Sequence, residues 1–172
     1  MNARRRYTAD ALRELFTYEP DTGILRWKVD RPRGVKAGDE AGCAFIASCG
    51  KKYRRISIRG KYHGAHLVIW CLQTGVWPDH EIDHRDNDGL NNRWANLRAA
   101  TRKQNSKNRT MPSNNTSGYK GVNFDKKARK WVAQIGSDGK KIYLGRFEDP
   151  KEAHAAYCAA ADKLHGEFAN HG

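Results

Sequence analysis

The sequence predicts an α+β protein in which two small modules follow one another. The first should contain two short strands that flank a polar loop, with a helix behind them. The second should be a three-stranded antiparallel sheet packed on one helix. Three observations predict this plan. Asp86-Asn-Asp-Gly89 is a strong turn between two apolar stretches, Asp138-Gly139 separates two alternating runs, and apolar residues recur at helical spacing after Asp149.

The first eighty residues mix short helical and strand patterns that are typical of a scaffold. Thr8 is a suitable N-cap for a short helix with an apolar face. Alternation predicts strands at Ile24–Lys28 and Tyr53–Arg59. An apolar helix should follow from about Ala65 to Thr74, and Gly75 is a suitable stop.

The next thirty residues, about 80–110, are rich in Asp, Asn and Arg. Ile82 and Leu97 can belong to two paired strands on either side of the turn, and Thr101 can cap a helix that runs to about Asn108. The expected local order is therefore strand, loop, strand, helix.

Residues 118–172 have a pattern of their own. Strands are expected from Gly118 to Phe124, from Lys130 to Gly136 and from Lys140 to Phe147, with a type I′ turn at Asp138-Gly139. Asp149, Pro150 and Glu152 form a capping box for a helix that Gly166 ends. Residues 111–117 are polar and lack periodicity, so we expect domains at 1–110 and 118–172 joined by a linker.

The composition points to a nucleic-acid partner. The formal charge is +13 and the pI is near 9.8, and no apolar run approaches the roughly 18 residues of a membrane span. The N-terminus has no secretory signal pattern, so we expect a cytoplasmic protein that acts in a bacterial or phage-infected cell. No Cys-x-x-Cys pair occurs, which argues against structural zinc, and Cys71 and Cys158 should be small buried residues.

The stretch from Asp83 to Arg109 resembles the HNH nuclease family, whose site is a ββα-metal or His-Me finger motif. It is most similar to the phage and intron-encoded homing branch. The motif residues stand in family order, as Asp83-His84, Asn91-Asn92-Arg93, Asn96-Leu97-Arg98 and Asn105. The resemblance implies a metal-dependent DNA endonuclease. Asn stands at the last position in place of the family's His, which argues against zinc-type ligation.

Phosphodiester hydrolysis explains the residue types. His84 can take the proton of the attacking water, and Asn96 can fix its tautomer. Asp83 and Asn105 offer the oxygen ligands that Mg²⁺ (or Mn²⁺) prefers. Asn108 is an alternative to Asn105, and Asp86 and Asp88 are alternative oxygens. Basic residues of the first module can contact DNA phosphates, namely Arg54, Arg55, Arg93, Arg98 and Arg102.

Residues 118–170 resemble the DNA-binding domain of plant ethylene-response (APETALA-type) transcription factors. The matching pieces are Tyr119-Lys-Gly-Val122, Trp131-Val-Ala-Gln-Ile135, Tyr143-Leu-Gly-Arg-Phe147 and Glu152-Ala153 with Ala155-Ala-Tyr157. The family's sheet lies in the major groove, which implies DNA contacts by Lys120, Asn123, Trp131, Gln134, Lys141 and Tyr143. Several family arginines are replaced here, which puts sequence preference in doubt.

Together the two modules predict an endonuclease that a DNA-binding sheet targets to double-stranded DNA. One catalytic module per chain should nick one strand as a monomer, and a DNA-assisted dimer would cut both. The competing interpretations are a DNA-binding regulator or architectural protein with an inert nuclease module, and an RNA-binding protein. The second sheet lacks the aromatic stacking signature of an RNA-recognition sheet, which counts against RNA.

Overall fold

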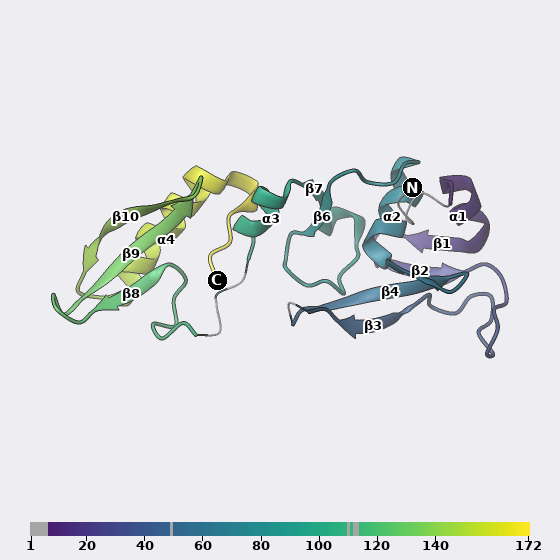
Figure 1. The fold of residues 1–172 in the computed structure, drawn as a ribbon, viewed down its shortest axis with the longest axis horizontal. Coiled ribbons are helices and arrows are strands. Elements are labelled where there is room, and N and C mark those ends of the chain that lie inside the picture. The colour runs from purple at the N-terminus through teal and green to yellow at the C-terminus, as the bar shows by residue number, and fades with distance from the viewer. Residues whose placement is uncertain (1–6, 49, 110, 112–113) are drawn as a thin grey trace. The chain divides into compact units, whose positions relative to one another are not determined.

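The computed structural model describes residues 7–48, 50–109, 111 and 114–172. The chain divides into two compact units, residues 1–102 and 103–172. In Figure 1 the first runs from purple to teal and the second from teal to yellow. Residues 103–109, which we expected at the end of the first module, belong to the second unit. Part of the expected linker (residues 112 and 113) lies outside the described residues.

The first unit is built from short elements. Helix α1 (Ala9–Leu15) begins at Thr8, whose Oγ1 accepts a hydrogen bond from the Ala11 N–H at 3.1 Å, as expected. Three small antiparallel sheets follow. Their strands are β1 (Phe16–Glu19) with β2 (Ile24–Trp27), then β3 (Cys43–Ile46), β4 (Lys52–Ile58) and β5 (Lys61–Gly64), and finally β6 (Glu81–His84) with β7 (Leu97–Ala100). Helix α2 (Ala65–Thr74) ends at Gly75, which has a left-handed φ of 82°.

The expected strand–loop–strand–helix order is present. Strands β6 and β7 flank a loop that contains a short 3₁₀ turn (Trp94–Asn96), and α3 (Arg102–Lys107) follows. The sequence did not predict β1, β3 or β5. Each has only four residues, and β3 exposes both faces, so it shows no alternation.

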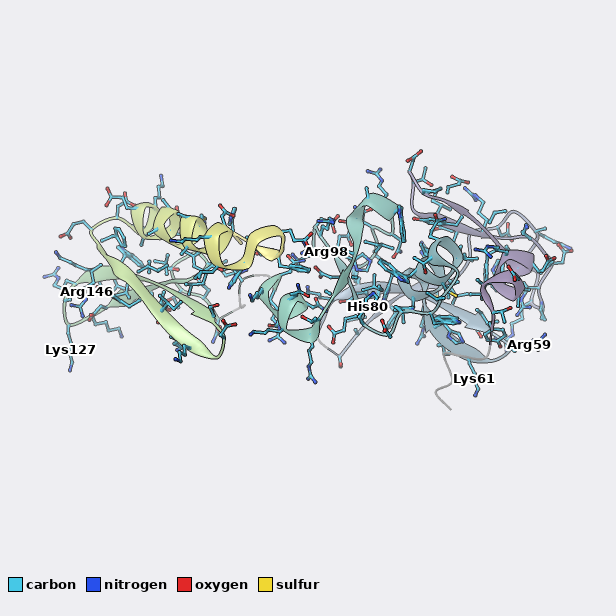
Figure 2. All side chains as sticks on the ribbon, turned by 90° about the horizontal axis from the view of Figure 1, so that it is seen from above. Arg59, Lys61, His80, Arg98, Lys127 and Arg146 are labelled. Carbon is cyan, nitrogen blue, oxygen red and sulfur yellow. The ribbon has the colours of Figure 1, made fainter. Side chains whose placement is uncertain are left out.

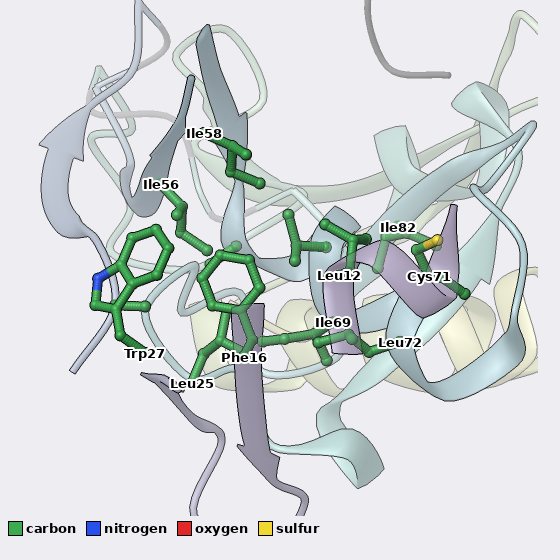
Figure 3. Close-up of a cluster of buried hydrophobic side chains, with 14 of the residues drawn as sticks. Leu12, Phe16, Leu25, Trp27, Ile56, Ile58, Ile69, Cys71, Leu72 and Ile82 are labelled. Atoms are coloured by element: carbon green, nitrogen blue, oxygen red, sulfur yellow. The ribbon is translucent and has the colours of Figure 1, made fainter. Parts of the chain in front are cut away.

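One apolar core holds the first unit together. Figure 3 shows Leu12 of α1, Phe16 of β1 and Ile69 of α2 meeting in this cluster. Ile82 of β6 and Leu97 of β7 join the same core and are 7% and 6% exposed. The two strands of the candidate motif are therefore anchored on the scaffold through their apolar residues.

The second unit has the expected antiparallel sheet and helix. Strands β8 (Val122–Asp125), β9 (Lys130–Ser137) and β10 (Lys140–Phe147) pair in the order β10-β9-β8, and α4 (Pro150–His165) packs against them before a 3₁₀ turn (Gly166–Phe168). Asp138 and Gly139 both have positive φ, 54° and 76°, as a type I′ turn requires. Asp149 caps α4 by accepting from the Lys151 N–H at 2.6 Å.

The helix and the sheet of the second unit approach closely because small residues line their contact. Ala133 of β9 and Ala153 and Ala161 of α4 have no exposed surface. Cys158 is only half-buried on this helix, whereas Cys71 of α2 is buried as expected. Within the described residues, no helix has the length and apolar character that crossing a membrane requires.

The close approach predicts a stability difference between two glycines of the same conformation. Gly118 and Gly121 both have φ +75°. A Cβ on Gly121 would overlap the ring of Tyr157, whereas a Cβ on Gly118 meets open space. Gly118→Ala should cost only the strain of a positive φ, about 1–2 kcal/mol. Gly121→Ala should cost about 1–3 kcal/mol more because of the overlap. Chemical denaturation of both variants, monitored by tryptophan fluorescence, measures the difference, and equal losses would contradict the packing account.

Candidate active site and nucleic-acid interface

The pairing of β6 with β7 places Asp83 opposite Arg98. Both side chains are 6% exposed. Arg98 donates to Oδ2 of Asp83 from Nε at 2.9 Å and from Nη2 at 2.7 Å. A buried carboxylate needs such a partner, since leaving a charge uncompensated in the interior is costly. Arg98, labelled in Figure 2, is therefore an internal partner of Asp83, and we withdraw it from the expected phosphate contacts.

His84 ends β6 and is also buried, with 5% of its surface exposed. Its Nε2 lies 3.2 Å from Oδ1 of Asn92. The amide of Asn92 is oriented by its own Nδ2, which donates to the carbonyl oxygen of Leu90 at 3.2 Å. Oδ1 can only accept, so Nε2 of His84 carries the proton and, in the neutral ring, Nδ1 carries the lone pair.

The protonation of His84 is set by opposing effects. Burial lowers the pKa of the imidazole below its ordinary value of 6.5. The hydrogen bond to Asn92 and the carboxylates of Asp86, Asp83 and Asp88 partly oppose this decrease. The net direction is downward, so the ring is neutral near pH 7, as a general base requires.

Two further rings surround His84. The ring centroid of His66, in the first turn of α2, lies 5.3 Å away in an edge-on arrangement, and that of Tyr53, in β4, lies 5.9 Å away. His66 and Tyr53 thus form part of the aromatic surroundings of His84.

Asn96 has a different task from the one we expected. Its Oδ1 accepts from the Asp86 N–H at 3.1 Å, and its Nδ2 donates to Oδ1 of Asp86 at 2.9 Å and to the Asn91 carbonyl at 2.7 Å. Asn96 thus closes the loop between β6 and β7, and Asn92 makes the contact with His84. Asn92 stood in the quoted motif, but spacing alone did not show which of these Asn residues faces the ring.

Asp86 is the centre of this loop. Besides Asn96, its carboxylate accepts from Asn91 Nδ2 at 2.6 Å and from the Asp88 N–H at 2.9 Å. Burial alone would raise the pKa of Asp86, but these hydrogen bonds lower it overall. Asp86 therefore serves as the loop's anionic acceptor, and Asp88 similarly accepts from the Leu90 N–H at 2.9 Å.

The scaffold holds the loop from two sides. The Tyr18 hydroxyl donates to the Asn92 carbonyl at 2.8 Å, and burial raises the pKa of Tyr18 to about 12, so the donor stays protonated. On the other side, Gly89 lies so close to β4 that a Cβ would overlap the Lys52 carbonyl and the Tyr53 ring. Because Asn92 is fixed at its backbone, its contact with His84 is preorganised.

The proposed metal ligands belong to different units. Asp83 lies in the first unit, and Asn105, half-buried on α3, lies in the second. The alternative, Asn108, is 1% exposed, and its Oδ1 accepts from Asn170 Nδ2 at 3.3 Å, which favours a structural role for it. Among the described residues, no three or more His, Cys, Asp or Glu side chains gather as a metal site.

The other four expected phosphate contacts of the first unit differ in how accessible they are to DNA. Arg54 pairs with Glu40 at 2.8 Å, and Arg55 stacks over Tyr62 with its guanidinium carbon 4.3 Å from the ring centroid. Arg93 and Arg102 are exposed. The last two are therefore the more accessible cations for a phosphate.

Alternation divides the residues of the second sheet between two faces. Asn123 lies opposite Val132, Tyr143 opposite Gln134, and Lys141 opposite Gly136. The four expected contacts Asn123, Gln134, Lys141 and Tyr143 thus share the face turned away from α4, which we call the outer face. Tyr143 is 60% exposed there.

Two expected DNA contacts lie elsewhere. Trp131 shares the parity of buried Ala133, packs on the core beneath α4 and lies 4.9 Å from the Phe124 ring. Lys120 donates from Nζ to the Arg109 carbonyl, and to the carbonyl and Oδ1 of Asn170 at 2.9 and 2.8 Å. Trp131 is therefore half-buried against the core and Lys120 is held by Asn170 and the Arg109 carbonyl, so both side chains have internal partners and their contacts with DNA stay predictions.

Comparison with known proteins finds a different family in each of two stretches of the chain. Residues 63–107 match the family model described as HNH endonuclease, and residues 117–167 match the AP2 domain model. Protein 3.8 of Escherichia phage T7 is 36% identical over 105 residues, which cover 60% of this chain and 86% of that protein.

The C-terminal part has plant relatives. It is 38% identical over 60 residues to the AP2-like ethylene-responsive transcription factor TOE2 of Arabidopsis thaliana, a match covering 35% of this chain and 12% of that protein. Dehydration-responsive element-binding protein 2D of the same plant is 36% identical over 84 residues, or 48% of this chain and 40% of that protein. No solved structure matches. The chain belongs to the HNH endonuclease family, is related to phage T7 Protein 3.8 and carries a C-terminal AP2 domain.

Proposed function

We propose that the protein is a metal-dependent DNA endonuclease that hydrolyses phosphodiester bonds in double-stranded DNA. The observation that carries the proposal is His84. The ring is buried, its Nε2 proton is committed to Asn92, and its neutral form is favoured near pH 7. This is the state that a general base needs before it accepts a proton.

The residues have separate tasks in this reaction. Nδ1 of His84 accepts the proton of the water that attacks phosphorus. Asn92 holds the ring and stabilises the imidazolium that forms, because its Oδ1 faces the Nε2 proton. The loop that Asp86 closes keeps this pair in place.

The donor set fits a divalent ion such as Mg²⁺ or Mn²⁺. Asp83, whose side chain Arg98 orients by two hydrogen bonds to Oδ2, is the proposed first ligand. Asn105 is the proposed second oxygen ligand, and Mg²⁺ needs few protein ligands since it keeps several waters. When bound, the ion would neutralise the charge that develops on the scissile phosphate.

The AP2 domain is the proposed targeting module. Its outer face offers polar and aromatic side chains to DNA, and the net charge of +13 favours association with the backbone. One catalytic module per chain implies a nick by the monomer, and a DNA-assisted dimer for a double-strand cut. A homing role in a phage-infected bacterial cytoplasm fits the relation to a phage protein.

A DNA-binding regulator with an inert nuclease module is the second candidate. The observation that favours it is the Asp83–Arg98 pair, which already occupies one oxygen of the proposed ligand. Cleavage assays separate the two candidates.

His84→Ala should abolish nicking of supercoiled plasmid in Mg²⁺ or Mn²⁺, with a rate loss of about 10²–10⁴-fold for a missing general base. DNA binding in a gel-shift assay should be unchanged, because His84 is buried. His171→Ala, at an exposed histidine of the second unit, is the matched control and should nick normally. If the wild type cuts no DNA substrate with either metal, the regulator takes precedence.

The pH profile of nicking should report the lowered pKa of His84. A base works when it is deprotonated, so activity should rise with pH through that pKa, and the midpoint of the acid limb should lie below 6.5. Asn92→Ala removes an interaction that raises the pKa. It should therefore move the limb to lower pH, while loss of ring orientation lowers the plateau rate by about 10–100-fold. A limb at or above pH 6.5 in the wild type would argue against His84 as the base.

Tyr143→Ala should weaken duplex binding roughly tenfold, about 1.4 kcal/mol, because an exposed aromatic side chain on the outer face is lost. Leu164→Ala removes an exposed apolar side chain from α4 and should leave binding unchanged. Fluorescence anisotropy with a labelled duplex measures both. Equal affinities for all three proteins would remove the outer face from the proposed interface.

A further inference from the structure

A basic pocket of about 330 Å³ lies within the second unit. Residues of α3, β9, β10 and α4 line it, together with Arg109 and Lys120 from the connecting segments. Its size is near the lower end for ligand sites, about 300 Å³, and suits one small ionic group with its waters. Of the expected outer-face contacts with DNA, Gln134 and Lys141 are among its lining residues.

The charge of the lining is one-sided. Four Lys and Arg residues line the pocket, and no Asp or Glu does. Lys120 is committed to internal oxygens. Within the described part of the chain, Lys107, Arg109 and Lys141 enter no ion pair. Asp138 is paired with Lys103 and is the one carboxylate shown to act on Lys107 and His165 among the described residues. Cations that converge with so little counter-charge repel one another, and an anion would relieve that repulsion.

The pKa of His165, which lines the pocket, is affected by the same positive charges. Its Nε2 lies 3.1 Å from the Gly136 carbonyl oxygen and donates to it. Nδ1 is buried without a hydrogen-bond partner among the described residues. Burial lowers the pKa of His165, and Lys107 and Lys120 lower it further, against the opposing effects of the Gly136 hydrogen bond and Asp138. The imidazolium is thus disfavoured until an anion enters.

The pocket also adjoins the outer face. Gln134 and Lys141 belong to both, so a group held in the pocket would lie beside bases that the outer face contacts. Backbone phosphates lie in that position relative to base edges, and they fix the register of a protein on the duplex. Lysine and arginine are the side chains that recognise phosphate, by charge and by the guanidinium fork respectively.

We propose that this pocket binds a phosphate group of the DNA backbone through Lys107, Arg109 and Lys141. The proposal rests on the DNA-binding part of the proposed function. It gives the last helix of the nuclease motif a second task, because Lys107 ends α3, the helix that carries Asn105. Docking of the AP2 domain on DNA would then fix α3 directly on the backbone.

The test uses full-length protein and the double variant Lys107→Gln/Arg109→Gln. Lys141 is left intact because it also lies on the outer face. The control is Lys127→Gln/Lys151→Gln, which removes the same charge from two exposed residues of this unit. Lys127 extends outward at the turn between β8 and β9 (Figure 2). Two readouts are the His165 ring signals in NMR at about pH 6, with inorganic phosphate added, and the salt dependence of duplex binding.

In the wild type and the control, phosphate should raise the pKa of His165 and move its ring signals toward the protonated position. The pocket variant should show no such shift. Its slope of log affinity against log salt should be smaller than that of the wild type by about one, since each phosphate contact contributes about 0.9. The control should keep a steeper slope than the pocket variant.

Each other outcome overturns the assignment. A phosphate-induced shift with an unchanged salt slope would assign the pocket to free phosphate rather than DNA. Equal slopes in the pocket variant and the control, without a shift, would mean that the pocket binds no phosphate. A wild type that fails to bind duplex DNA would instead overturn the proposed function itself, so the two failures are distinguishable.

Discussion

The buried ion pair between Asp83 and Arg98 is the constraint on which the candidate active site depends. A carboxylate with 6% exposure has lost most of its hydration, and Arg98 replaces that hydration with two hydrogen bonds. Removing one partner of such a pair typically costs about 3–5 kcal/mol. The pair therefore fixes the register of β6 against β7, and this register places His84 opposite Leu97, at the exact point where the loop begins.

The loop that starts there is organised by polar contacts, because its residues offer little apolar surface. The Asp86 carboxylate accepts hydrogen bonds from Asn91 and Asn96, and Tyr18 of the scaffold donates one to the Asn92 carbonyl. Each asparagine can both donate and accept, so a run of them satisfies a tight loop while leaving one carbonyl oxygen for His84. The asparagines of the motif thus have two different tasks. Asn91 and Asn96 hold the loop together, and Asn92 orients His84.

The sequence predicted most of the architecture where local signals were strong. The caps at Thr8 and Asp149, the stop at Gly75 and the hairpin turn at Asp138-Gly139 are all confirmed, because each depends on the chemistry of a few neighbouring residues. Strands β1, β3 and β5 escaped prediction, since each is short and depends on pairing with a neighbouring strand rather than on a strong local pattern. The place of residues 103–109 in the second unit also escaped prediction, because the sequence of α3 (Arg102–Lys107) carries no signal of which unit it packs on.

The corrections to the site share one cause. A charged or aromatic residue in a motif was expected to face DNA, although the same residue types also satisfy a buried partner. Arg98 forms an ion pair with Asp83, Lys120 donates hydrogen bonds to Asn170, and Trp131 packs against the core beneath α4. Parity along the strand separates Trp131 from Gln134, but the orientation of the whole sheet relative to α4 had to be known before parity could be used.

These internal commitments change what the charge of +13 means. Cations that neutralise buried or backbone oxygens add to the formal charge, but they release no counterions when DNA binds. Affinity would then depend on cations without such internal partners, among them exposed Arg93 and Arg102 in the first unit and Lys107, Arg109 and Lys141 of the basic pocket in the second. Because Lys107 belongs both to that pocket and to the helix of Asn105, the same few residues would hold the DNA backbone and carry the last position of the nuclease motif.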